Sequence, residues 1–117
     1  METLYKKLYD AYQDGDLTRM EKYLKRGVPP SYSDDALFTM SACSGDYDAL
    51  KLLLSYDKED RVNKNREIMG LACVFCHYDC VDLLSKYVDI EKFKYTTAYE
   101  TIKNHQHPVS PTYISVH

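Results

Sequence analysis

Short segments of the chain carry apolar residues at helical spacing. Leu17, Met20 and Leu24 recur three and four residues apart, and Leu50, Leu53 and Leu54 do the same. Spacing of this kind puts the apolar side chains on one face of an α-helix. The pattern predicts short helices over Leu4–Asp14, about 17–24, Ala36–Ser44, about 47–54, Ile68–Phe75 and Asp79–Lys86.

The predicted helices are separated by residues that end or begin helices. Gly15 and Gly45 suit the left-handed conformation that follows a helix, and Asp16 and Asp46 are placed to cap the next one. Gly27, with two prolines after it, ends the second helix. The polar stretches 28–35, 57–66 and 88–96 are expected to be loops between pairs of helices.

The pairs of helices repeat one sequence phrase. Gly15, Gly45 and Cys76 occupy equivalent positions, 30 and 31 residues apart, and a further 30 residues lead to Gln106 and His107. A period of this size is typical of chains built by stacking helical units. The sequence therefore predicts an all-α protein that forms a short solenoid of helix-turn-helix repeats.

The repeated phrase resembles the ankyrin repeat, which has paired alanines, a glycine-histidine turn and a leucine pair. The residues that carry the resemblance are Met69, Ala72, Cys73, His77, Leu83 and Leu84 in the third unit, Phe38, Ser41, Ala42, Gly45, Leu53 and Leu54 in the second, and Leu8, Ala11, Gly15, Leu24 and Gly27 in the first. Here the period is shorter than the family's usual length of about 33 residues. The resemblance implies an ankyrin-like domain over 1–107, with units at about 4–30, 34–60 and 66–90, a partial unit at 97–107, and a tail over 108–117.

A weaker resemblance is to myotrophin-like small ankyrin proteins, which bind actin capping protein. It rests on Gly15-Asp16-Leu17 and on Thr97-Ala98-Tyr99-Glu100, together with the similar chain length. This resemblance implies a regulator of actin capping protein as an alternative function.

Composition narrows the class of function. The length of 117 residues is that of one domain, and the net charge of −3 argues against a dedicated nucleic-acid binder. No apolar run approaches the roughly 20 residues that span a membrane, and the N-terminus lacks the apolar core of a signal peptide. We expect a cytoplasmic protein, with the nucleus as the alternative location, that binds neither nucleic acid nor membrane.

A cluster of cysteine and histidine residues is the one candidate in the sequence for a metal site or a catalytic site. Cys73, Cys76, His77 and Cys80 lie close together in the sequence, with Cys43 one unit earlier, and thiolate and imidazole are zinc ligands. Cys73 and Cys80, however, occupy apolar positions of their helices, where cysteine packs as a small hydrophobe. We therefore expect no metal, no cofactor and no enzymatic activity, and a zinc- or thiol-dependent activity at Cys73, Cys76 and His77 remains the alternative.

The favoured function is binding of another protein, as an adaptor or a stoichiometric inhibitor, which is what the resemblance implies. Such a stack would bind through its concave groove and loop tips. Val74 and Phe75 stand where the other units have polar residues, and an exposed apolar pair would mark an interaction site. The alternative is that Phe75 packs under the neighbouring loop or the C-terminal tail. The predicted partner-binding residues are Tyr32, Asp34, Asp35, Arg61, Lys64, Arg66, Val74, Phe75, Lys94 and Tyr95.

Overall fold

The computed structural model describes residues 2–89, and within this range the chain is all-helical. Its helices are α1 (Glu2–Gln13), α2 (Leu17–Lys25), α3 (Tyr32–Ser44), α4 (Tyr47–Ser55), α5 (Arg61–Lys64), α6 (Arg66–Val74) and α7 (Tyr78–Ser85). No strand occurs among the described residues, so the predicted all-α class is confirmed. The predicted partial unit over 97–107 and the tail over 108–117 lie outside them.

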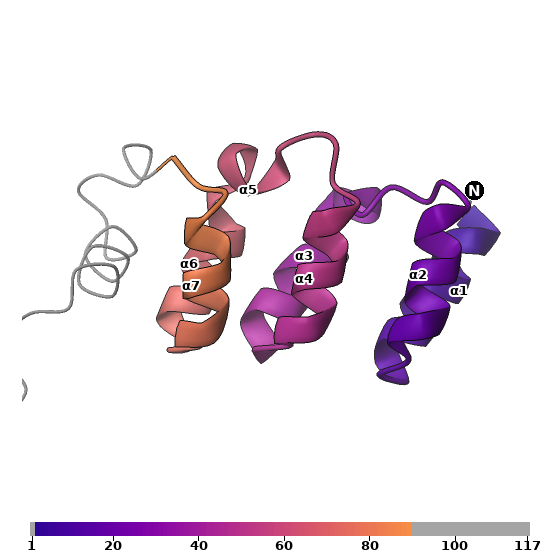
Figure 1. Cartoon of the computed structure of the whole chain (residues 1–117), viewed down its shortest axis with the longest axis horizontal. Helices are drawn as coiled ribbons and strands as arrows, with labels where there is room; N and C mark the ends of the chain where they lie inside the picture. Colours follow the sequence, from indigo (N-terminus) through magenta and orange to yellow (C-terminus); the bar gives the residue numbers. More distant parts are fainter. Residues whose placement is uncertain (1, 90–117) are drawn as a thin grey trace, which may run out of the picture.

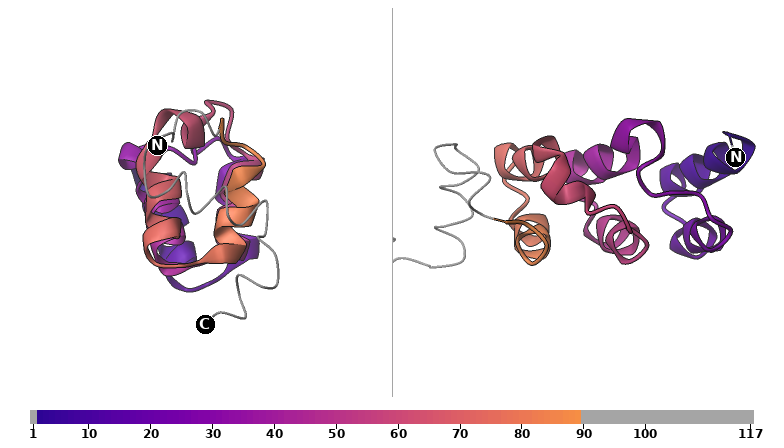
Figure 2. Two further views of the ribbon diagram at one scale, coloured as in Figure 1. Left: turned by 90° about the vertical axis from the view of Figure 1, so that its left-hand side faces the viewer. Right: turned by 90° about the horizontal axis from the view of Figure 1, so that it is seen from above.

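Six of the helices form three antiparallel pairs that lie side by side: α1 with α2, α3 with α4, and α6 with α7 (Figure 1). Seen from above, α1, α3 and α6 form one layer, and α2, α4 and α7 form the other (Figure 2). The short turns within the pairs lie along one edge of this arrangement, here called the turn edge. The longer connections between pairs, with α5 in one of them, lie along the opposite edge, here called the loop edge (Figure 1).

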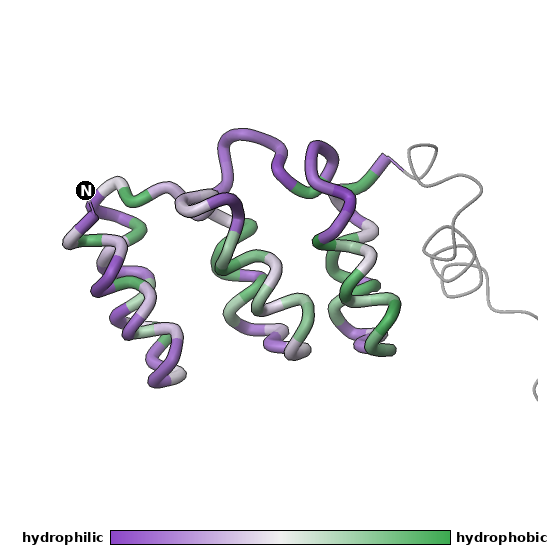
Figure 3. Tube along the Cα trace, turned by 180° about the vertical axis from the view of Figure 1, so that it is seen from behind, coloured by the Kyte–Doolittle hydropathy of each residue, from purple (hydrophilic) through white to green (hydrophobic). Residues whose placement is uncertain are grey.

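The core consists of the apolar faces that the paired helices turn toward one another. Its largest fully buried side chains are Phe38, Leu8, Met20, Leu37, Leu50, Leu53, Ile68, Met69, Leu84 and Val28. Figure 3 shows apolar stretches along the helices of the second and third pairs. Leu17 departs from the predicted apolar stripe of α2, because its side chain is 38% exposed. No helix within residues 2–89 is long and apolar enough to cross a membrane.

The three turns within the pairs share one geometry. Gly15, Gly45 and Cys76 all have positive φ, at 69°, 75° and 59°. In each turn the amide after this residue bonds back to the helix: Asp16 N–H to Ala11 O, Asp46 N–H to Ser41 O and His77 N–H to Ala72 O, each at 2.9 Å. This six-to-one bond closes a helix end when a left-handed residue follows it. The three positions that the sequence predicted to be equivalent therefore share one backbone conformation.

Asp16 and Asp46 were both predicted to cap the helix that follows them, and only the Asp16 side chain does so. The Asp16 carboxylate accepts a bond from the Arg19 amide at 3.1 Å and caps α2 as expected. Asp46 precedes α4, but its side chain makes no capping bond. It accepts a bond from the Tyr12 hydroxyl at 2.8 Å instead, and burial together with this bond raises the pKa of Tyr12. Asp46 therefore joins the first pair to the second rather than capping α4.

The loop edge contains more regular structure than the sequence predicted. The expected loop over 57–66 holds the single helical turn α5. The expected loop over 28–35 ends in three left-handed residues, Ser33, Asp34 and Asp35, with φ between 59° and 62°. This turn places Asp35 inside the protein, with 1% of its surface exposed.

Asp35 is held there by partners from the next connection. Arg61 donates to its two carboxylate oxygens at 2.9 Å from Nε and 2.7 Å from Nη2, and Asn65 donates at 3.0 Å. The bonds to Asp35 raise the pKa of Arg61. A buried carboxylate needs such partners because desolvation of an unpaired charge is costly. The ion pair thus ties the two long connections together.

We predict that Leu53→Ala lowers the free energy of unfolding by about 2–5 kcal/mol, because it leaves a cavity in the core. Urea unfolding followed by circular dichroism measures the change. Lys51→Ala is the matched control, since Lys51 is exposed on the same helix, and we expect a change within about 0.5 kcal/mol. An unchanged midpoint for Leu53→Ala would contradict the described core.

We predict that Arg61→Ala lowers the free energy of unfolding by about 3 kcal/mol, since it leaves the Asp35 carboxylate buried without its cation. The exposed Arg66, which forms no ion pair within residues 2–89, provides the control Arg66→Ala. Equal stability of the two variants in thermal unfolding would show that the buried pair contributes nothing.

Candidate functional site

The predicted partner-binding residues divide between the two edges of the molecule. Those near the loop edge are Tyr32, Asp34, Asp35, Arg61, Lys64 and Arg66, whereas Val74 and Phe75 lie at the turn edge. Arg66 begins α6 and Val74 ends it, which separates them by about 12 Å at the helical rise per residue. The two groups do not form one site. Lys94 and Tyr95 lie outside the described residues.

Several of the loop-edge residues are engaged within the protein. Asp35 and Arg61 pair with each other, and the Tyr32 ring packs on the Tyr5 ring with their centroids 4.5 Å apart. Asp35 was expected at an exposed loop tip, and its burial corrects that expectation. Among the predicted residues at this edge, the exposed charged side chains are Asp34, Lys64 and Arg66, whereas Asp35 and Arg61 neutralise each other.

The turn edge of the third pair exposes three large apolar side chains close together in the sequence. Val74 is 68% exposed, Phe75 52% and Tyr78 50%. We call these three residues the turn patch. Because Cys76 adopts the left-handed conformation, α6 ends at Val74 and α7 starts at Tyr78. Val74 and Phe75 are thus exposed within the described residues, which the interpretation as an interaction site requires.

The turn patch is particular to the third pair. The residues equivalent to Val74 and Phe75 are Gln13 and Asp14 in the first pair, and Cys43 and Ser44 in the second. Exposed apolar side chains that lie close together make this turn a candidate interaction site.

Tyr78 was not among the partner-binding residues predicted from the sequence, although it belongs to the turn patch. The signal for it was present: Leu17 and Tyr47 occupy the equivalent position, so a large apolar residue begins the second helix of every pair. A side-chain hydrogen bond with Cys76 is the main cause of the raised pKa of Tyr78.

His77 serves as a link between the second and third pairs. Its Nε2 atom lies 2.9 Å from the carbonyl oxygen of Cys43, which requires the tautomer with hydrogen on Nε2. Its ring also packs over Gly45, where an added Cβ atom would lie 2.5 Å from Nδ1. This contact gives His77 a structural role and gives the second turn a reason for glycine besides its positive φ.

The cysteines follow the packing expected from their positions. Cys73 and Cys80 are buried and Cys76 is exposed. Burial is the main cause that raises the pKa of Cys80, to about 12, so this thiol stays protonated at neutral pH. Within residues 2–89, no group of three or more His, Cys, Asp or Glu side chains is placed to hold a metal ion.

Comparison of the chain with protein-family models, with curated proteins and with solved structures gives no match. A function is therefore inferred from the residues of this chain and their geometry.

We predict that Cys76→Gly raises the free energy of unfolding by about 1 kcal/mol, because a left-handed residue other than glycine costs about 1–2 kcal/mol. Denaturant unfolding measures the gain, and Cys76→Ala is the control, since alanine keeps the same strain.

The reverse change, from glycine to alanine, provides a second comparison. Gly15→Ala and Gly45→Ala introduce the same backbone strain, but only Gly45→Ala also places a methyl group against the His77 ring. Gly45→Ala should therefore be the more destabilising of the two. Equal losses would contradict the described contact.

Proposed function

We propose that the helix pairs form an ankyrin-like stack and that this protein binds a partner protein, as an adaptor or a stoichiometric inhibitor. The shared turn geometry of Gly15, Gly45 and Cys76 supports the stack, because equivalent units are expected to close their helices in the same way. The links from Tyr12 to Asp46 and from His77 to Cys43 support it too, since each joins one pair to the next.

The turn patch is the observation that carries the proposal of binding. Val74, Phe75 and Tyr78 are each at least half exposed. Aromatic side chains are enriched among the residues that contribute most to binding energy, since they bury large areas and lose little conformational freedom. A partner with an apolar pocket would bury both rings of the turn patch and exclude water from them.

Binding fits the turn better than catalysis does. The Nε2 atom of His77 faces the Cys43 carbonyl, so His77 is positioned by its contact with the second pair rather than as a base for Cys76.

At the opposite edge, Asp34, Lys64 and Arg66 would act mainly on the rate of association with the partner, because exposed charges change the rate of encounter more than the lifetime of a complex.

The test starts with a partner captured from a lysate of the source and identified by mass spectrometry. We predict that Phe75→Ala weakens its binding about thirtyfold, the loss of about 2 kcal/mol typical of a central aromatic anchor. Isothermal titration calorimetry with purified partner measures the affinity. The melting temperature should stay close to that of the unmodified chain, because Phe75 is 52% exposed.

Tyr87→Ala is the matched control. Tyr87 is another exposed aromatic residue, at 45%, but it follows α7 at the loop edge. The variant Tyr87→Ala should leave the affinity for the captured partner unchanged. If Tyr87→Ala weakens binding and Phe75→Ala does not, the binding surface lies at the loop edge.

A further inference from the structure

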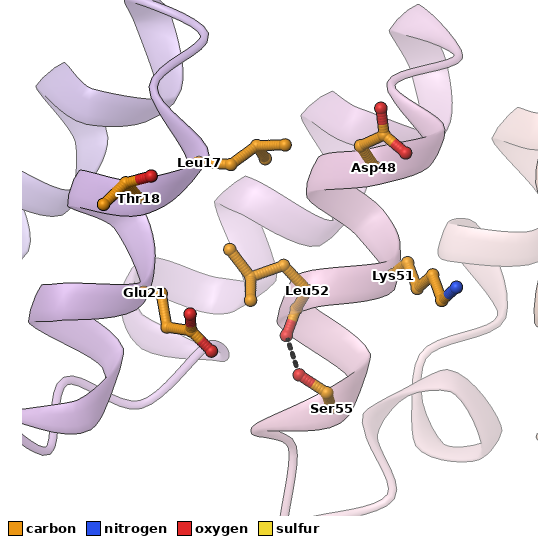
Figure 4. Close-up of a pocket in the computed structure, with 7 residues that line it drawn as sticks. All are labelled: Leu17, Thr18, Glu21, Asp48, Lys51, Leu52 and Ser55. Atoms are coloured by element: carbon orange, nitrogen blue, oxygen red, sulfur yellow. Dashed lines mark hydrogen bonds between the residues drawn. The ribbon is translucent and has the colours of Figure 1, made fainter.

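In the layer formed by α1, α3 and α6, the first and second pairs pack less closely than the second and third. The α3 helix packs far more extensively on α6 than on α1. A hollow of about 360 Å³ lies between α2 and α4, lined by Leu17, Glu21, Asp48, Lys51 and Leu52 among others (Figure 4). We call the surface formed by Leu17, Glu21, Asp48 and Leu52 the seam.

The hollow continues toward the turn edge. A second hollow of about 360 Å³ shares Leu17 and Asp48 with the first and extends past Gly15 and Asp46. The two hollows together follow the junction of the pairs, so they form a groove rather than an isolated pit. Each is at the small end of the range for ligand pockets, which suits a few side chains of a peptide better than a complete small molecule.

The seam has an apolar floor. Leu17 and Leu52 come from different helices, and both side chains extend into the space between α2 and α4 (Figure 4). Leu17 is 38% exposed and Leu52 is half-buried, so apolar surface remains in contact with water. A ligand that covered these two side chains would gain the free energy of removing that surface from water.

The rim of the seam is acidic. Glu21 and Asp48 stand beside the two leucines, and Asp46 lies at the turn end. Glu21 and Asp46 accept bonds from the neutral hydroxyls of Tyr56 and Tyr12, and no salt bridge within residues 2–89 involves any of the three carboxylates. The Lys51 side chain extends away from the leucines (Figure 4). The negative charge is therefore available to a ligand.

We propose that the seam binds a short amphipathic helix of a protein, one that carries leucine-like side chains flanked by lysine or arginine. An apolar stripe on such a helix matches Leu17 and Leu52, and its basic flanks match Glu21, Asp46 and Asp48. The seam lies on α2 and α4, away from the turn patch on α6 and α7, so the protein has a second binding surface. Two separate surfaces suit an adaptor that holds two proteins together.

The test uses the full chain and two fluorescein-labelled peptides of about 18 residues, which is about five helical turns. One is an amphipathic helix of leucine, alanine and lysine, and the other has glutamate in place of every lysine. Fluorescence anisotropy measures both affinities. We expect the basic peptide to bind at least about tenfold more tightly than the acidic one, and its affinity to fall as salt concentration rises.

Two variants of the seam should weaken binding of the basic peptide. Leu17→Ser removes apolar floor at a partly exposed position, and we expect a loss of about tenfold. The double variant Glu21→Gln, Asp48→Asn removes two charges, and we expect a loss of about fivefold with a weaker dependence on salt. Glutamine at position 21 can still accept a hydrogen bond from the Tyr56 hydroxyl, so the double variant should fold. It therefore tests whether the seam binds the peptide even if Leu17→Ser fails to fold.

The matched control removes two exposed carboxylates elsewhere, in the double variant Asp10→Asn, Glu67→Gln. It should keep the affinity of the unmodified chain. The proposal is overturned if both peptides bind equally well or if this control loses as much affinity as the seam variant. It is also overturned if Val74→Ser, Phe75→Ser abolishes peptide binding while the seam variants retain it. The first two results leave the proposal for the turn patch untouched, whereas the third would place the peptide at the turn patch.

Discussion

The helices of residues 2–89 are too short to be stable alone, and the rest of the structure depends on this constraint. The longest has 13 residues and most have eight or nine, whereas an isolated helix in water needs about 12–15 residues to be even marginally stable. Each helix must therefore bury its apolar face against a partner. The core between the two layers of helices, around Phe38, Leu50 and Leu53, buries these apolar faces, because every long helix contributes side chains to it.

The tight turns convert this requirement into a defined arrangement. A left-handed residue and a six-to-one bond close the first helix of each pair and reverse the chain within a few residues. The same turns carry the side chains that join neighbouring pairs, Asp46 to the first pair and His77 to the second. The residues of the turn patch are consequently held on a well-connected edge, which would reduce the conformational entropy lost on binding the proposed partner.

The sequence could predict the helices and their turns because these depend on local patterns. Glycine at a helix end and leucines at helical spacing are visible within about ten residues. The position of Asp35 could not be predicted in this way, since its burial depends on Arg61, 26 residues further along the chain. The single turn α5 was missed because four residues carry too little periodicity to distinguish a helix from a loop.

The candidate surfaces show the same division between local and distant information. Val74 and Phe75 were found by comparing equivalent positions of the three units, which needs only the sequence. The seam could not be found, because Leu17 and Leu52 belong to different pairs and Leu17 was predicted to lie in the apolar stripe of its helix. Their partial exposure depends on how the two pairs lie against each other, which is a property of packing rather than of either helix.

Amide hydrogen exchange of the chain with and without its captured protein partner tests the central claim most directly. Exchange reports which backbone segments a bound protein covers, and it requires no substitution. The account predicts slower exchange at residues 74–78 in the complex, around the turn patch, with little change at Arg61–Lys64. Slower exchange confined to the loop edge, with residues 74–78 unchanged, would contradict it.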